Sequence, residues 1–337
     1  MSEKILEVKN LVSSFKTTNN ECVVAVRGVS FSVYKGKSFG IVGESGSGKS
    51  TVALSIMRLI KPNVGTISGD GILLQGVDIL RLSDSAMRKI RGNKISMIFQ
   101  EPMTSLNPVF TIGNQIQESI LTHNSSSNKE AKDRCIELLN LVGIPVPEKR
   151  IYDYPHQLSG GMRQRVMIAM ALACNPDVLI ADEPTTALDV TIQAQVLDLM
   201  RRIQSEMDMG IILITHDLGI ISEMCDEVAV MYCGKIVEHT DVKSLFSNPM
   251  HPYTQKLIAS IPSLNYSKEA PKRLYTIDGV VPCLNRLPFG CTFQNRCNKA
   301  DISCTGKNGE PELIEVASGH LAACFHTGDS GPKSINE

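Results

Sequence analysis

Short apolar runs alternate with longer amphipathic stretches over the first 247 residues of the chain. Apolar runs bounded by turn residues predict buried strands, and longer runs with helical spacing predict helices. The predicted strands are residues 5–9, 38–42, 95–99, 178–181 and 211–215, and the predicted helices are residues 49–60, 115–121, 129–142 and 161–174. Strands that alternate with helices predict an α/β fold with a largely parallel sheet.

The pattern changes near residues 248–252, which read N-P-M-H-P. Beyond residue 261 there is little periodicity, and proline, glycine and cysteine dominate. This change predicts a domain of residues 1–250 followed by a C-terminal extension of residues 251–337. The polar residues 327–337 are expected to fray.

Length and charge limit the possible functions. At about 150 residues per domain, 337 residues predict roughly two domains. The chain has 34 Lys and Arg against 35 Asp and Glu, which excludes a strongly basic nucleic-acid binder at the level of the whole chain. The longest apolar run, residues 166–174, is far shorter than the ~20 residues of a membrane-spanning helix. The N-terminus has no long apolar stretch, so neither a membrane span nor a secretory signal is expected.

Residues 43–50 read G-E-S-G-S-G-K-S and match the pattern G-x-x-x-x-G-K-[ST], between a predicted strand and a predicted helix. In a phosphate-binding loop, glycines let backbone N–H groups point at phosphate oxygens, and the helix N-terminus adds a favourable dipole. Lys49 is expected to pair with the β- and γ-phosphates, and Ser50 to offer its hydroxyl to Mg²⁺. The competing interpretation is a chance Gly/Ser loop. The nucleotide-binding residues expected here are Gly43, Ser45, Gly46, Gly48, Lys49, Ser50 and Thr51.

The run at residues 178–183, V-L-I-A-D-E, ends in two carboxylates. Downstream of a phosphate loop, Asp182 is expected to hold Mg²⁺ through water, and Glu183 to polarise the attacking water as a general base. Without such a loop, a strand that ends in a solvated acidic turn would be the better interpretation.

A second anion site is predicted at residues 158–165, L-S-G-G-M-R-Q-R, which open the helix predicted at 161–174. Ser159, Gly160 and Gly161 would bind phosphate at the helix N-terminus. A simple N-cap with a flexible turn is the alternative. Because one phosphate loop already serves one nucleotide, a second phosphate site favours service to a partner's nucleotide across a dimer interface.

With these motifs in place, residues 5–250 resemble the ATPase subunits of ABC transporters. The phosphate loop, Gln100, residues 158–161, residues 182–183, residues 187–189 and His216 occur in the family's order. The resemblance implies a P-loop NTPase fold with a RecA-like parallel-sheet core, a helical subdomain at about residues 101–172 and a small antiparallel β part. It also implies that two such domains sandwich two ATP molecules, each between one chain's phosphate loop and the other chain's Ser-Gly-Gly segment.

The resemblance also assigns roles to single residues. Gln100 looks like the glutamine that senses Mg²⁺ and the attacking water, and His216 like the switch histidine that contacts the γ-phosphate. Asp189 resembles the residue that signals across the dimer. Phe15 lies where the family stacks an aromatic ring on adenine, although a core phenylalanine is an equal alternative.

A narrower resemblance concerns the importers of dipeptides, oligopeptides, nickel and glutathione. Residues 99–110, F-Q-E-P-M-T-S-L-N-P-V-F, look like this branch, as do Met162, residues 251–254 and the Cys-rich C-terminus. The branch implies a peripheral subunit on the cytoplasmic face of the membrane. Its partners would be a second, related ATPase subunit, two transmembrane permeases that dock after Gln100, and indirectly an external substrate-binding protein. A homodimer and a buried loop are the respective alternatives, and no nucleic-acid partner is expected.

Five of the ten cysteines gather near the C-terminus, and four of them have the spacing C-x5-C-x6-C-x19-C. Four thiolates can hold Zn²⁺ or an iron–sulfur cluster, and the absence of a close C-x2–4-C pair favours iron and sulfur. The importer branch implies a [4Fe–4S] cluster on these residues, with zinc and an unmetallated module as alternatives. Cys283 is expected to be a bystander. The four expected ligands are Cys291, Cys297, Cys304 and Cys324.

The leading hypothesis is therefore an ATPase that powers an importer. A soluble ABC-type ATPase that acts on nucleic acid or ribosomes is a second hypothesis, but such a protein would usually show two ATPase domains or a basic surface. A metal-sensing regulatory ATPase is a third hypothesis, which the intact Glu183 disfavours.

Overall fold

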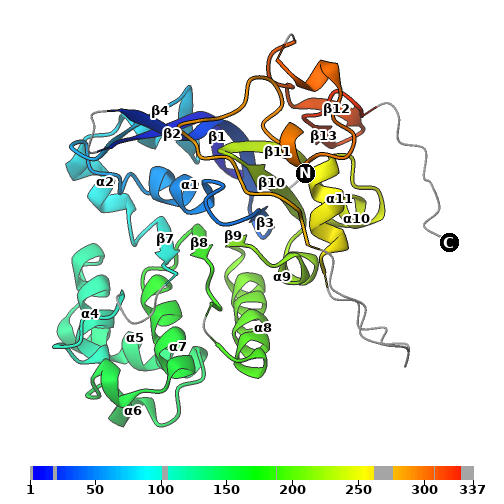
Figure 1. Cartoon of the computed structure of the whole chain (residues 1–337). Coiled ribbons are helices and arrows are strands. Elements are labelled where there is room, and N and C mark those ends of the chain that lie inside the picture. Colours follow the sequence, from blue (N-terminus) through cyan, green and yellow to red (C-terminus); the bar gives the residue numbers. More distant parts are fainter. Residues whose placement is uncertain are drawn as a thin grey trace, which may run out of the picture. The chain divides into compact units, whose positions relative to one another are not determined.

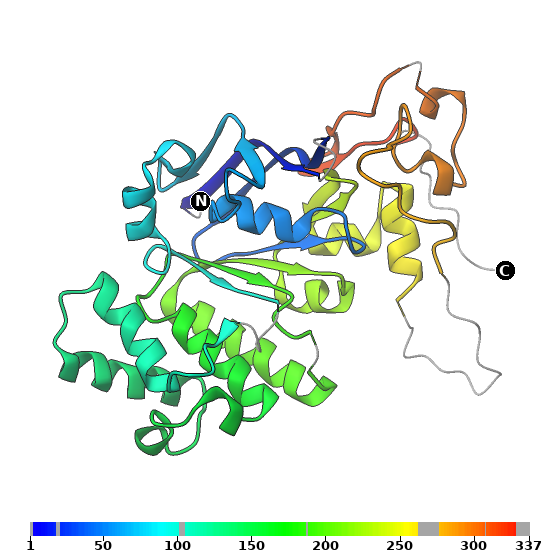
Figure 2. The same cartoon turned by 60° about the vertical axis from the view of Figure 1, so that its left-hand side comes forward.

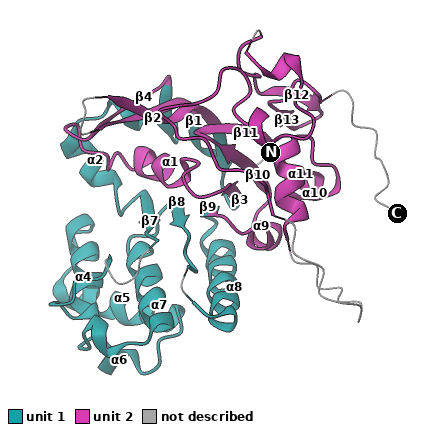
Figure 3. Ribbon diagram, viewed as in Figure 1, with its two compact units in different colours: residues 1–8, 31–38, 71–214 teal, residues 9–30, 39–70, 215–337 magenta. Residues whose placement is uncertain are grey.

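The computed structural model describes residues 3–17, 21–100, 105–186, 188–261, 276–306 and 308–327. The chain forms two compact units whose segments are interleaved in the sequence (Figure 3). Unit 1 consists of Met1–Val8, Phe31–Ser38 and Gly71–Ile214, and unit 2 of Lys9–Ser30, Phe39–Asp70 and Thr215–Glu337. The domain boundary expected near residue 250 stays a prediction.

Unit 1 contains the parallel strands β7 (Ile95–Ile98), β8 (Val178–Asp182) and β9 (Gly210–Thr215), in the order β7-β8-β9 (Figure 1). All residues of β8 and β9 are buried, which explains why both strands read as unbroken apolar runs. The three strands predicted in this region are confirmed. A mixed segment that the patterning did not resolve supplies β5 (Gly71–Leu74), β6 (Val77–Asp78), η1 (Ile79–Arg81) and α2 (Asp84–Ile90).

The helices of unit 1 begin at polar caps. Thr111 caps α4 (Ile112–His123), and Ser127 forms a capping box with Glu130 on α5 (Asn128–Leu141). Helices α4, α5 and α7 pack on one another, and α7 also contacts α8. The remaining elements are α6 (Pro147–Arg150), η2 (Pro155–Gln157), α7 (Gly160–Ala171) and α8 (Val190–Met207).

Unit 2 holds a second group of strands, in the order β3-β10-β11-β13-β12. The β3–β10 pair is parallel and the other pairs are antiparallel. These strands are β3 (Ser38–Val42), β10 (Glu227–Tyr232), β11 (Lys235–Asp241), β12 (Ile314–Ala317) and β13 (His320–Ala322). The helices are α1 (Lys49–Ile56), α9 (Leu218–Met224), α10 (Val242–Ser247) and α11 (Pro252–Ala259). Strand β4 (Gly65–Ser68) pairs antiparallel with the second half of β1 (Lys4–Lys16), and β2 is Cys22–Tyr34.

The Cys-rich segment shares the hydrophobic core of unit 2. The rings of Tyr232, Tyr253 and Phe293 lie with centroids 4.7 to 5.3 Å apart, and all three side chains are fully buried. Cys291 and Cys304 belong to the same hydrophobic cluster. Figure 2 shows the segment, in orange and red, as mostly irregular chain with the short helices η3 (Gln294–Arg296) and η4 (Ile302–Cys304).

Several sequence-based boundaries are corrected. Helix α1 ends at Ile56 rather than at residue 60, because Arg58 has a positive φ of 50° and the chain then turns toward Pro62. Strand β1 extends to Lys16, well beyond the predicted residue 9. Helix α8 and strands β10 and β11 were not predicted. Among the described helices, none has the length and apolar character needed to cross a membrane.

Candidate active site

The glycines of the loop between β3 and α1 are required by its backbone. Gly48, the N-cap of α1, has φ 101°, and a Cβ there would lie 2.5 Å from the carbonyl oxygen of Ala25. A Cβ at Gly43 would lie 2.2 Å from the carbonyl oxygen of Met231. Gly46, also at positive φ, has open space around it. The loop therefore follows a path that only glycine permits at residues 43 and 48.

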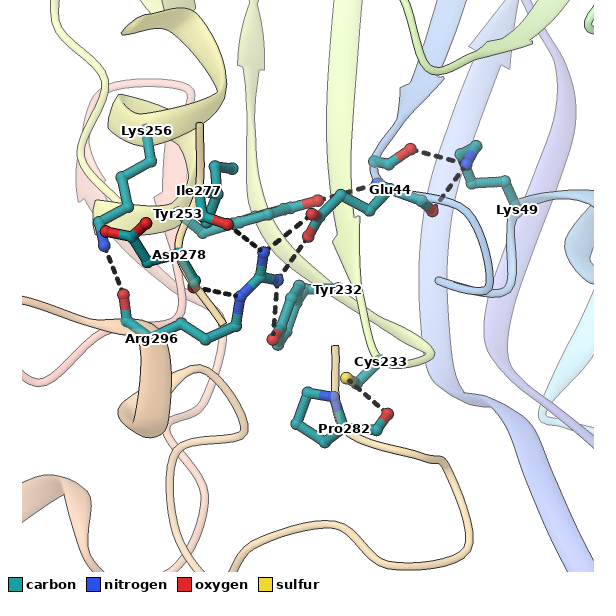
Figure 4. Close-up of polar contacts among 11 residues, drawn as sticks. Glu44, Lys49, Tyr232, Cys233, Tyr253, Lys256, Ile277, Asp278, Pro282 and Arg296 are labelled. Carbon is teal, nitrogen blue, oxygen red and sulfur yellow. Dashed lines mark hydrogen bonds and ion pairs between the residues drawn. The ribbon is translucent and has the colours of Figure 1, made fainter. Parts of the chain in front are cut away.

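Lys49 folds back over this loop. Its side chain is buried, and Nζ donates hydrogen bonds to the carbonyl oxygens of Gly43 at 2.7 Å and Glu44 at 3.0 Å (Figure 4). Ser50 and Thr51 are half-buried in the first turn of α1, and Ser45 is exposed. The Ser47 hydroxyl is buried without a hydrogen-bond partner in the described part of the chain. The Lys49 ammonium group and the N-terminus of α1 are hydrogen-bond donors suited to a polyphosphate. The glycines leave space at the loop that a Cβ would fill.

The loop residue Glu44 was not predicted to matter. Its backbone N–H donates to the Tyr253 hydroxyl at 2.9 Å, and both carboxylate oxygens accept hydrogen bonds from Arg296. The motif gives no signal for this contact, because position 44 is a free position of the pattern and Arg296 lies far along the sequence.

The end of β8 carries the two carboxylates that the sequence singled out. Asp182 is its last residue and is buried. Glu183 has φ 46°, and its N–H donates to the Ile214 carbonyl at 2.8 Å. The Glu183 Oε2 atom accepts hydrogen bonds from Gln100 Nε2 at 3.0 Å and from Thr186 Oγ1 at 2.8 Å. Gln100 and Glu183, which the chain order separates widely, thus come together in unit 1, and a carboxylate oriented in this way can accept a proton from water.

The Ser-Gly-Gly segment opens α7. The Ser159 hydroxyl accepts a hydrogen bond from the Met162 N–H at 3.3 Å, so Ser159 is the N-cap. Gly160 is exposed, and a Cβ there would meet nothing within 4 Å. A Cβ at Gly161 would lie 2.9 Å from Ile192, so this glycine lets α7 pack closely on α8. Ser159 caps the helix while the helix N-terminus stays exposed, so the N-cap and the predicted anion site are compatible.

Three further candidates lie apart from these contacts. Asp189 is exposed and caps α8 by accepting from the Ile192 N–H at 2.9 Å. His216 is exposed just after β9, where Asp217, not His216, caps α9. Phe15 is half-buried on β1, in register with Gly65 of β4. Ala187 and residues 101–104, which belong to the motifs quoted above, lie outside the described residues.

The candidate residues divide between the two units. Unit 2 contains the phosphate loop, Phe15 and His216, and within it the structure brings Lys49 to the loop carbonyls. Unit 1 contains the Ser-Gly-Gly segment, Asp182 and Asp189, and within it the structure brings Gln100 to Glu183. Thr186 joins this second group, and the only sequence signal for it is its place in the turn after the acidic pair.

The four C-terminal cysteines of the predicted cluster influence one another. Burial, with a smaller contribution from Cys304, Cys324 and Cys297, raises the pKa of Cys291 to about 12. Backbone N–H groups two residues ahead donate to two of the sulfurs, Lys299 N–H to Cys297 and His326 N–H to Cys324, each at 3.4 Å. Ligand atoms of Asp301, Cys304 and His326 lie within 4.8 Å of one another. Cys283 is exposed.

The N–H donors beside Cys297 and Cys324 would suit metal-bound thiolates, because N–H groups stabilise charge on sulfur. The raised pKa of Cys291 means that its thiol stays protonated at neutral pH unless a cation lowers that pKa. The nearby imidazole and carboxylate at Cys304 would also suit zinc.

The chain is similar to ATP-binding proteins of transporters. Residues 26–186 match the model of the ABC transporter family, and residues 237–304 match that of the oligopeptide/dipeptide transporter C-terminal region. A putative peptide import ATP-binding protein of Brucella melitensis is 51% identical over 331 residues, covering 96% of this chain and 97% of that protein. The dipeptide transport ATP-binding protein of Bacillus subtilis is 53% identical over 302 residues, with coverage of 90% and 89%.

Solved structures agree with the fold. The dimeric ABC transporter cassette MJ0796 superimposes with a TM-score of 0.62 at 28% identity, over 70% of this chain and 98% of that one. The cbiO1 protein of Clostridium perfringens gives a TM-score of 0.61 at 28% identity, over 73% and 92%. The chain therefore belongs to the ABC transporter family of ATPases, in the branch that carries the oligopeptide/dipeptide transporter C-terminal region.

Proposed function

We propose that this chain is the ATP-hydrolysing subunit of an ABC importer that takes up dipeptides or oligopeptides. The observation that carries the cargo class is the match of residues 237–304 to the oligopeptide/dipeptide transporter C-terminal region. Relatives named for peptide and dipeptide transport, about half identical over almost the whole chain, support it. Nickel or another small cargo stays the alternative, because the external binding protein and the permeases would select the cargo.

The residues proposed to bind and hydrolyse ATP are those of the family's motifs. Lys49 would neutralise the β- and γ-phosphates from inside the loop, and Ser50, Asp182 and Gln100 would hold Mg²⁺ and its waters. Bound Mg²⁺ supplies charge stabilisation to the phosphoryl group. Glu183 would take a proton from the attacking water while Gln100 orients that carboxylate. His216 would contact the γ-phosphate and Phe15 the adenine ring.

We propose that the Ser-Gly-Gly segment serves the nucleotide of a second ATPase subunit. Gly160 is exposed, and the open space around its Cα gives a phosphate close access to the N-terminus of α7. Asp189, exposed at the N-terminus of α8, would carry the signal to the partner. A related but different ATPase is the favoured partner, and the dimeric state of the similar cassette MJ0796 supports pairing with a second ATPase.

The domain division proposed from sequence is an ATPase domain of residues 1–250, with its helical subdomain at about 101–172, and an extension of residues 251–337. In the extension, we propose that Cys291, Cys297, Cys304 and Cys324 hold a [4Fe–4S] cluster. The N–H donors to the Cys297 and Cys324 sulfurs support it. Zinc, with His326 replacing one thiolate, is the competing arrangement.

Isolation of the intact complex tests this function. The tagged chain would be purified from membranes in mild detergent under anaerobic conditions, and the partners identified. We expect two permeases, a second ATPase and a peptide-binding protein, with the chain held at the cytoplasmic face through the permeases. Reconstituted in vesicles, the complex should take up peptide only with ATP. Recovery of ribosomes or soluble partners alone would instead support the soluble-ATPase hypothesis.

A further inference from the structure

The side chain of Arg296 connects the Cys-rich segment to the phosphate loop within unit 2. Arg296 ends the short helix η3, directly before Cys297, and its side chain is only 3% exposed. Its guanidinium makes two hydrogen bonds to the Glu44 carboxylate, at 2.6 Å to Oε2 and 2.9 Å to Oε1 (Figure 4). This bidentate geometry fixes both the position and the rotation of the carboxylate.

The guanidinium is itself held in place on all sides. Nε donates to the Asp278 carbonyl at 3.1 Å, and the two terminal nitrogens also donate to the Ile277 carbonyl and the Tyr232 hydroxyl. With the two bonds to Glu44, all five N–H donors of the arginine have acceptors. Arg296 therefore reaches Glu44 from a fixed position rather than as a mobile surface side chain.

Glu44 passes this constraint to the nucleotide site. The Tyr253 hydroxyl accepts the Glu44 N–H at 2.9 Å, so the residue is held at its backbone as well as at its carboxylate. The carbonyl of the same residue accepts from Lys49 Nζ at 3.0 Å and from the Ser47 N–H at 3.2 Å. A change in the orientation of Glu44 would thus move the ammonium group that is expected to meet the phosphates.

We propose that Arg296 is a positioning residue for the phosphate loop, through which the folded Cys-rich segment raises the affinity of this chain for Mg-ATP. The inference rests on the proposed function, because it assumes that residues 43–50 bind ATP. It assigns to the C-terminal extension a direct role in nucleotide binding, in addition to any role in the folding of unit 2.

The chain offers a matched control. Glu310, from the same C-terminal segment, makes a bidentate ion pair with Arg27 at 3.0 and 2.8 Å and a further contact with Lys235 at 2.6 Å. This pair links the same segment to the same unit through Arg27 and Lys235 rather than through Glu44. Glu310→Gln therefore shows how the affinity for Mg-ATP responds when an ion pair of the same segment is lost without a change at Glu44.

The test measures the equilibrium dissociation constant for Mg-ATP in the full-length chain. Thermal unfolding and the absorbance of any group bound at the C-terminal cysteines are the controls for folding. We expect Arg296→Gln and Glu44→Gln each to weaken binding by about tenfold, a typical coupling between sites. The double variant should bind Mg-ATP no more weakly than the single variant with the lower affinity, because both changes break the same contact. Arg296→Lys, which keeps the charge but not the bidentate geometry, should recover part of the loss.

Four results would overturn the proposal. Arg296→Gln could bind Mg-ATP as tightly as Glu310→Gln, or the effects of the two single changes could multiply in the double variant. If Arg296→Gln does not fold, Glu44→Gln and Arg296→Lys decide the question, and unchanged affinity in both would refute the proposal.

If the unaltered chain binds no Mg-ATP, the proposed function itself fails. Hydrogen exchange at the Glu44 and Ser47 amides then still reports whether Arg296 positions the loop, and equal exchange in Arg296→Gln and the unaltered chain would reject it.

Discussion

Two glutamates at the candidate site are held in different ways. Glu183, at the end of β8 in unit 1, is oriented by the neutral amide of Gln100 and the neutral hydroxyl of Thr186. Glu44, in the phosphate loop of unit 2, is bound at both oxygens by the buried guanidinium of Arg296. Neutral donors orient a carboxylate without adding positive charge beside it, whereas the guanidinium commits its partner to an ion pair.

The chemistry that a carboxylate can perform depends on its hydrogen-bond donors. Glu183 is suited to accept a proton, because Gln100 and Thr186 fix its direction and are themselves uncharged. Glu44 is suited to a structural task, because protonating it would break a buried bidentate pair. The same side chain would thus serve the proposed catalysis in one unit and loop geometry in the other, and substitutions should separate the two roles.

The largest expected effect follows from replacing the proposed base. Glu183→Gln should lower the rate of ATP hydrolysis by about 10³-fold, because the amide cannot take the proton from water. The affinity for Mg-ATP should change little, because the shape and hydrogen bonds of the side chain persist. Single-turnover hydrolysis and equilibrium binding measure the two quantities. Hydrolysis by Glu183→Gln at the parent rate would show that another residue is the base.

Backbone geometry in the phosphate loop can be broken independently of either glutamate. Gly48→Ala combines a positive φ with a Cβ placed 2.5 Å from a carbonyl oxygen. A strain of about 2–3 kcal/mol corresponds to roughly 50-fold weaker Mg-ATP binding, measurable by titration. Gly46→Ala is the matched control, because it has a positive φ but open space. Equal losses in both variants would mean that the steric clash at residue 48 is not decisive.

The ion pair of Glu44 should also contribute to the stability of unit 2. Arg296→Met should lower the free energy of unfolding by about 3 kcal/mol, because it leaves the Glu44 carboxylate without its partner. Glu310→Gln should cost less than about 1 kcal/mol, because Arg27 is 22% exposed whereas Arg296 is 3% exposed. Urea unfolding monitored by circular dichroism compares them. A larger loss in Glu310→Gln than in Arg296→Met would reverse this order.

A third glutamate extends the comparison toward full burial. Glu238 is fully buried in β11 and accepts hydrogen bonds from the N–H groups of Met250 and His251 and contacts His320 Nε2 at 2.7 Å. The Nδ1 atom of His251 accepts the Tyr253 N–H at 3.0 Å, which requires that nitrogen to be unprotonated. Burial lowers the pKa of His251 to about 4.

This lowered pKa predicts a pH dependence of stability. Between about pH 6.5 and 4, the unfolded chain binds a proton at His251 that the folded chain does not, so stability falls as the pH falls. The loss should reach on the order of 2 kcal/mol. His251→Asn keeps an acceptor for the Tyr253 N–H and removes the titration, so its stability should vary less over this range. An unchanged pH slope in that variant would assign the dependence to other groups.

Local motifs allowed the phosphate loop and the acidic strand end to be anticipated, because short-range backbone geometry and the family's motif order constrain them. The hydrogen bond between Gln100 and Glu183 was not predicted, although both residues were assigned to the attacking water. The buried strands β8 and β9 also read clearly as apolar runs. Strand β10 and helix α8 were missed, although β10 contains a short apolar run and α8 carries apolar residues at helical spacing. The pair Arg296–Glu44 was invisible, since it depends on packing between segments 252 residues apart.

The most direct test of the two-glutamate account measures hydrolysis rate and Mg-ATP affinity side by side in Glu183→Gln and Glu44→Gln. The account predicts a crossed result, in which Glu183→Gln loses rate and keeps affinity. Glu44→Gln should lose about tenfold in affinity and retain most of the rate at saturating ATP. Loss of both quantities to the same degree in the two variants would contradict the claim that the glutamates perform different tasks.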